Sequence, residues 1–60
     1  MKIFVMVDME GISGIVMKEQ VSSAEPHYAK GREYLCNDVN ACVDGLFKGG
    51  ATNVIVRDAH

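Results

Sequence analysis

The chain has 60 residues and a formal net charge of −2, with acidic and basic side chains interspersed along it. No basic stripe is available to neutralise a phosphate backbone, which argues against a nucleic-acid partner. The longest uninterrupted apolar run, residues 3–7, is far shorter than the roughly 20 residues that cross a bilayer, so a membrane span is also excluded for this part of the protein.

The first predicted element is a strand over Lys2 to Val7. This stretch is apolar almost throughout, as expected of a strand that is buried on both faces of a parallel sheet. Residues 9–14 follow with two glycines and a serine, which predict a loop that turns tightly and lets a ligand approach. Residues 15–24 show no clear period and are expected to form a mobile connection.

A helix is predicted from Pro26 to the pair Gly49-Gly50, because apolar residues recur there at three- and four-residue steps. Ser22 or Ser23 is expected to cap its start, and the glycine pair supplies the left-handed residue that ends it. Gly31 is expected to be a weak point inside this helix.

A second strand of β-branched residues is predicted over Thr52 to Arg57, which gives a β-α-β unit with a right-handed crossover and a parallel sheet. A parallel sheet needs cover on both faces, whereas one helix covers only one. A chain of this length also buries only about 60% of its unfolded surface. Residues 1–60 are therefore expected to be the N-terminal β-α-β portion of a single, larger three-layer α/β domain that continues beyond His60.

Two features indicate a cytoplasmic protein. Met1-Lys2 leads directly into the first strand, and no charged-then-apolar leader precedes it. Cys36 and Cys42 are six residues apart on the predicted helix, which places them too far apart for a disulfide and on different faces. Both observations suit a reducing compartment.

Three potential metal ligands follow the predicted strands: Asp8 and Glu10 after the first, and His60 after the second. The carboxyl ends of parallel strands lie at the same edge of a sheet, where open α/β sheets place their ligands. Strands that are neighbours are about 4.8 Å apart, so the three side chains could share an ion. Carboxylates with an imidazole suit zinc, manganese, cobalt or ferrous iron better than calcium or magnesium.

Other interpretations of these residues stay open. Asp8 could cap a turn while Glu10 is solvated, and His60 could be an ordinary exposed imidazole. Asp58 could orient the His60 imidazole, start a loop or cap a following helix.

The run from Val7 to Gly14, Val-Asp-Met-Glu-Gly-Ile-Ser-Gly, resembles the start of the D-aminopeptidase family of metallopeptidases. The resemblance covers the whole chain, since Tyr28, Gly31-Arg32, Asn40-Ala41 and Asp58-Ala59-His60 follow in the family's order.

The resemblance implies a zinc-dependent aminopeptidase that hydrolyses short peptides with an N-terminal D-amino acid. In the family, the residues matching Asp8, Glu10 and His60 ligate a two-zinc (Zn2+) centre, the residue matching Asp8 bridges the ions, and the remaining ligands and a catalytic His lie downstream. No catalytic residue is therefore expected within these 60 residues, and the fragment alone should be inactive. The family also forms homo-oligomeric rings.

Two rival functions are compatible with parts of the sequence. Haloacid-dehalogenase-like phosphatases place an Asp nucleophile after the first strand and a second Asp two residues later, but here the second acid is Glu10, followed by Gly11-Ile12. The other rival is a non-catalytic β-α-β interaction fragment with a solvated acidic loop, which predicts no tight metal binding.

Overall fold

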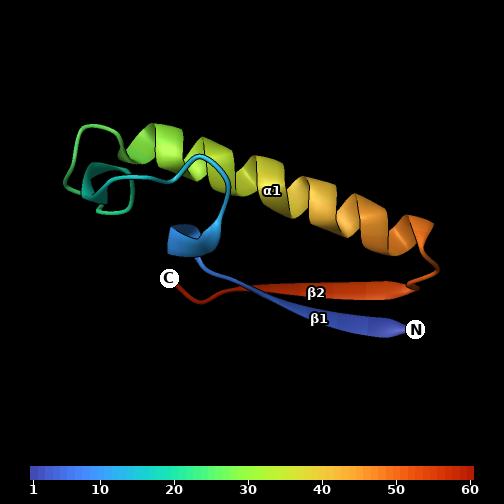
Figure 1. Cartoon of the computed structure of the whole chain (residues 1–60). Helices are drawn as coiled ribbons and strands as arrows, with labels where there is room; N and C mark the ends of the chain where they lie inside the picture. Colours follow the sequence, from blue (N-terminus) through green and yellow to red (C-terminus); the bar gives the residue numbers. More distant parts are fainter.

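The structure is a computed structural model that describes residues 1–60, and it shows two parallel strands with one long helix along one side (Figure 1). This arrangement confirms the predicted β-α-β unit of an α/β fold. The chain forms, in order, β1 (Lys2–Val7), the 3-10 turns η1 (Met9–Gly11) and η2 (Lys18–Gln20), the helix α1 (Tyr28–Lys48) and β2 (Asn53–Asp58).

The two strands are neighbours and pair in parallel, from Lys2 opposite Asn53 to Val7 opposite Asp58. The second strand starts and ends one residue later than predicted, because Thr52 belongs to the turn that precedes it. The N–H of Thr52 donates to the carbonyl oxygen of Met1 at 2.8 Å, and the Thr52 hydroxyl donates to the same oxygen at 3.1 Å. The pairing brings both carboxyl ends to one edge of the sheet.

Helix α1 starts later than predicted, at Tyr28. His27 occupies the N-cap position and makes no side-chain capping hydrogen bond. The expected serine cap was wrong, because the segment before the helix is folded into turns, with the N–H of Glu25 donating to the carbonyl of Ser22 at 2.9 Å. Ser22 and Ser23 therefore lie too far ahead of the first helical turn to satisfy its N–H groups.

The end of α1 is as predicted. Gly50 has a φ of 109°, and the N–H of Ala51 reaches back to the carbonyl of Leu46 at 3.0 Å. These two features close the helix with the left-handed residue that favours glycine.

Replacing Gly50 with alanine should lower the free energy of unfolding by about 1–2 kcal/mol, because an L-residue is disfavoured at this φ. A Cβ there would meet no atom within 4 Å, so the cost is conformational and not steric. Denaturant titration measures it. An unchanged free energy of unfolding would show that the helix ends in another way in solution.

The connection between η1 and α1 is anchored, contrary to the expectation of a mobile segment. Gln20 is only 6% exposed, and its side-chain oxygen accepts the N–H groups of Val16 and Met17 at 2.7 and 3.0 Å. Its amide nitrogen donates to the carbonyl of Gly14 at 2.9 Å. One buried amide therefore fixes the backbone at three points.

Gly31 is a contact point and not the weak point that was expected. It is buried in α1, where a Cβ would lie 2.1 Å from the carbonyl oxygen of Gln20 and 2.8 Å from the Cε of Met9. Met9, at 1% exposure, is the most buried apolar side chain. The lack of a side chain at Gly31 thus lets η1 and η2 pack closely against the helix.

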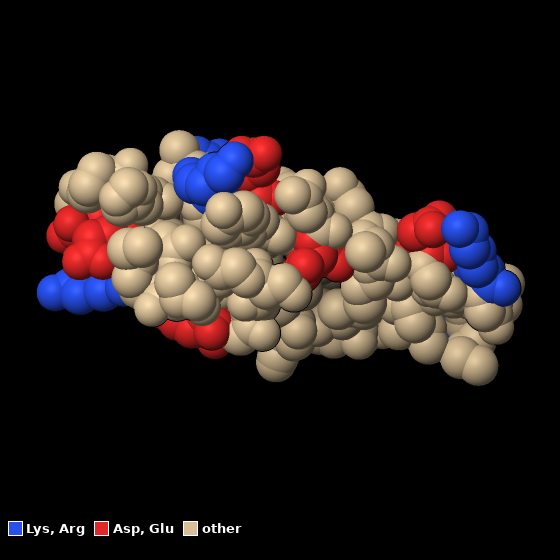
Figure 2. Space-filling model, turned by 45° about the horizontal axis from the view of Figure 1, so that its top comes forward, with Lys and Arg blue, Asp and Glu red and all other residues tan.

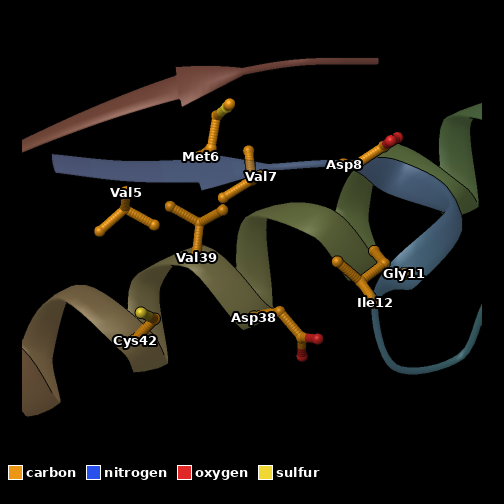
Figure 3. A pocket seen from close by; sticks show the side chains of 9 residues that line it. All are labelled: Val5, Met6, Val7, Asp8, Gly11, Ile12, Asp38, Val39 and Cys42. Carbon is orange, nitrogen blue, oxygen red and sulfur yellow. The ribbon is translucent and has the colours of Figure 1, made fainter.

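The sheet has a covered and an uncovered face. Exposure alternates along β1, and Val5 points toward α1 whereas Met6 points away from it (Figure 3). On the uncovered face Phe4, Met6 and Ile55 are 60%, 64% and 50% exposed. This is the surface that a three-layer domain would cover, and the larger domain stays a prediction.

The charged side chains form small, separate groups on the face seen in Figure 2, with no continuous basic patch. None of the helices in the structure combines the length and the apolar character that crossing a membrane requires. Cys36 and Cys42 are both exposed and free of a disulfide, as expected.

Candidate metal centre

The three candidate ligands come from three places that the sheet topology brings together. Asp8 directly follows β1, Glu10 lies in η1, and His60 comes two residues after β2. The N–H of Ala59 donates to the carbonyl of Val7 at 2.7 Å, which carries the strand pairing on to the edge of the sheet. His60 is thereby placed over η1.

These side chains converge as expected. The Nδ1 atom of His60 lies 2.9 Å from Oε1 of Glu10 and 3.9 Å from Oδ1 of Asp8. One ligand atom from each residue lies within 4.8 Å of the others. Two carboxylates and one imidazole thus face a common point.

The local backbone that produces this convergence is a turn and not a continuation of the strand. Glu10 lies in a 3-10 turn, and Asp8 stands at the N-cap position of that turn with extended backbone. The Asp8 carboxylate makes no capping hydrogen bond, so the alternative role of a turn cap is not observed. In Figure 3 it projects from the end of β1.

The imidazole of His60 is held on two sides. Its Nε2 atom lies 2.8 Å from the carbonyl oxygen of Val21, opposite the contact with Glu10. Asp58 accepts the backbone N–H of His60 at 3.0 Å, so it shapes the chain after β2 and does not contact the ring. Asp58 is therefore a loop-starting residue in this structure.

The proximity of the three groups changes their protonation. Hydrogen bonding to Glu10, followed by partial desolvation and the Glu10 charge, raises the pKa of Asp8. The same hydrogen bond from Asp8, together with that from His60, lowers the pKa of Glu10. The pKa of His60 is raised, first by Glu10 and then by the Val21 carbonyl. These contacts therefore favour the protonated forms of Asp8 and His60 and the ionised form of Glu10.

The donor set fits a transition-metal ion such as zinc. Zinc bonds to oxygen and nitrogen of about 2.0–2.2 Å place two ligands of a tetrahedral ion roughly 3.3–3.6 Å apart. The observed contacts of 2.9 and 3.9 Å from Nδ1 lie on either side of that range. A cation would also compete with protons for these three side chains.

A sequence profile of the D-aminopeptidase family matches residues 1–60, the whole of the chain. The chain belongs to this family. It is 40% identical over 60 residues to a D-aminopeptidase of Bacillus subtilis (strain 168), a match that covers 100% of this chain and 22% of that relative. No solved structure matches the chain.

Two residues that support the candidate metal centre were missed in the sequence. Val21 contributes a backbone carbonyl, and Gln20 holds the segment that carries it. Any residue type has a backbone carbonyl, and the surrounding stretch has no period, so neither contact leaves a pattern in the sequence. The only feature of the sequence that pointed to these contacts was a single glutamine, Gln20, in an irregular segment.

Proposed function

We propose that the protein is a metal-dependent aminopeptidase that hydrolyses short peptides with an N-terminal D-amino acid. In this proposal Asp8, Glu10 and His60 supply part of a dinuclear zinc centre. The observation that carries it is the convergence of these three side chains within 4.8 Å, in a chain that belongs to the D-aminopeptidase family.

Each residue has a distinct task at such a centre. Asp8 would offer the carboxylate oxygens at the end of β1, Glu10 those in η1, and His60 an imidazole nitrogen from beyond β2. When bound, the ions supply a Lewis acid that polarises a peptide carbonyl and lowers the pKa of water. The remaining ligands and the group that transfers protons would come from outside residues 1–60, so this segment alone is proposed to be inactive.

The proposal also covers the cellular location and the oligomeric state of the enzyme. We propose a cytoplasmic homo-oligomer, in keeping with the family resemblance and with the two cysteines that form no disulfide. The match with the D-aminopeptidase family favours a peptidase over both the phosphatase and the non-catalytic fragment, because it covers the entire chain.

A peptidase assay with the full-length protein tests the proposal. We expect a dipeptide with an N-terminal D-alanine to be hydrolysed faster than its L counterpart, with activity lost on chelation and restored by zinc. Hydrolysis that is indifferent to chelators, or a preference for the L-peptide, would refute it. A phosphorylated Asp8 after incubation with a phosphate ester would instead support the phosphatase.

Zinc affinity should fall as the pH is lowered, beginning above the ordinary histidine pKa of about 6.5. The pKa of His60 is raised, so its protonated form competes with the metal already at that pH. Affinity should fall roughly tenfold per pH unit for each proton displaced. Isothermal titration calorimetry from pH 8 to about 5 measures this dependence, and constant affinity would remove His60 as a ligand.

In the metal-free protein, the contribution of His60 to the free energy of unfolding should increase as the pH is lowered, whereas zinc affinity decreases. A raised pKa of His60 in the folded state stabilises that state fully below the unfolded pKa, and this contribution is lost as the pH rises through the folded pKa. The His60→Gln variant is the control for both pH effects. In this variant, zinc affinity and the free energy of unfolding should both lose the pH dependence that His60 contributes.

A further inference from the structure

The two nitrogens of the His60 imidazole face different kinds of partner. Nε2 lies 2.8 Å from the backbone carbonyl oxygen of Val21, whereas Nδ1 faces the carboxylates of Glu10 and Asp8. The Val21 carbonyl oxygen and an ionised Glu10 carboxylate both only accept hydrogen bonds, so in the absence of a metal the two contacts fit an imidazole that carries a hydrogen on each nitrogen. A cation bound among the carboxylates would take the place of the Nδ1 hydrogen, whereas Nε2 would keep its hydrogen bond to the Val21 carbonyl.

We propose that His60 binds the metal through Nδ1, that the Val21 carbonyl fixes this tautomer, and that Gln20 is the positioning residue that holds the carbonyl in place. The inference rests on the proposed metal centre. It assigns the donor atom and two supporting residues of that centre. Carbonyl partners commonly set the orientation and tautomer of a metal-ligating histidine.

The Gln20 side chain is suited to this task because its amide both accepts and donates. It is 6% exposed, accepts two backbone N–H groups from Val16 and Met17, and donates to the carbonyl of Gly14. The backbone carbonyl of Gln20 lies against Gly31, at a place where α1 has no side chain. Val21 directly follows this fixed point, so its carbonyl has little freedom to leave the imidazole.

This arrangement lets a metal replace a proton without rotation of the ring. When His60 is protonated, the Nδ1 hydrogen is donated to Glu10 and the Nε2 hydrogen to Val21. Binding of a divalent cation at Nδ1 releases the first proton to solvent and leaves the second hydrogen bond in place. Histidine therefore contributes one released proton for each metal bound in this way.

The tautomer can be read directly by NMR of the full-length protein labelled with 15N-histidine, with the His60 signals assigned by their loss in His60→Gln. With zinc bound, we expect an Nε2 that carries a hydrogen and an Nδ1 perturbed by the metal. Zinc on Nε2 would overturn the inference while leaving the proposed function intact. Zinc that leaves both His60 nitrogens unchanged would contradict the proposed metal centre itself.

The role of Gln20 is tested by Gln20→Met, which removes all three side-chain hydrogen bonds at similar size. We expect zinc affinity to fall about 10–100-fold, as for other partners of metal ligands, with a mixture of His60 tautomers. Asn37→Met, the matched loss of an exposed amide on α1, should change neither. Unchanged affinity and a single tautomer in folded Gln20→Met would overturn this role.

A conservative variant separates positioning from folding. Gln20→Glu keeps an oxygen that accepts the N–H groups of Val16 and Met17 but loses the donor to Gly14. We expect its zinc affinity and tautomer mixture to lie between those of Gln20→Met and the unmodified protein. If Gln20→Met does not fold, Gln20→Glu provides the test. Unchanged zinc affinity and a single His60 tautomer in Gln20→Glu would contradict the positioning role of Gln20.

Discussion

Replacing Asp8 with alanine should reduce both zinc binding and peptidase activity of the full-length protein by more than about 100-fold. Loss of a partner that merely orients a metal ligand costs roughly 10–100-fold, so loss of a ligand itself should cost more. The fold should survive, because the Asp8 side chain is 59% exposed and makes no capping bond to η1. Calorimetric zinc titration and peptide hydrolysis measure the two effects.

A matched carboxylate on the helix gives the control for Asp8. Asp44 is exposed on α1, where it forms an ion pair with Lys48 at 2.9 Å, far along the chain from the candidate centre. Asp44→Ala should retain zinc binding and activity, since exposed pairs of this kind contribute only about 0–1 kcal/mol to stability. Equal losses in both variants, or full activity in Asp8→Ala, would rule out a specific role for Asp8.

Replacing Gly31 with alanine should lower the free energy of unfolding by about 1–3 kcal/mol, the usual cost of overpacking. Helix propensity alone predicts the opposite sign, because alanine is favoured over glycine inside a helix by about 0.5–1 kcal/mol. The steric cost should win, since the new Cβ would lie 2.1 Å from the Gln20 carbonyl oxygen. Relief of that clash requires η2 to move away from α1.

Gly45 supplies the matched substitution on the same helix. A Cβ there would meet no atom within 4 Å, so Gly45→Ala should raise the free energy of unfolding by about 0.5–1 kcal/mol. Denaturant titrations of the two variants measure whether each substitution raises or lowers the free energy of unfolding. A stabilising Gly31→Ala would mean that η2 does not pack against α1 as the structure shows.

The sequence was sufficient to predict the elements that bring the site together. The apolar run before Asp8 and the β-branched run before His60 indicated two parallel strands, and parallel strands bring their carboxyl ends to one edge. This argument depends on topology alone. It therefore predicted the convergence of the three side chains even though Glu10 lies in a 3-10 turn and not in extended backbone.

The sequence was insufficient where contacts between segments decide the conformation. Gly31 was judged by helix propensity, which contains no information on the Gln20 carbonyl that packs against it. The serines before α1 were judged as caps, but local turns such as that from Ser22 to Glu25 use the backbone first. Both errors came from local rules applied where the packing of η2 and its flanking turns against α1 is decisive.

The most direct test of the metal centre is a crystal structure of the full-length protein with zinc, with data collected at the zinc absorption edge. We expect an anomalous peak within about 2.0–2.2 Å of ligand atoms from Asp8, Glu10 and His60. An ion bound elsewhere, with these three side chains still joined only to one another, would contradict the account.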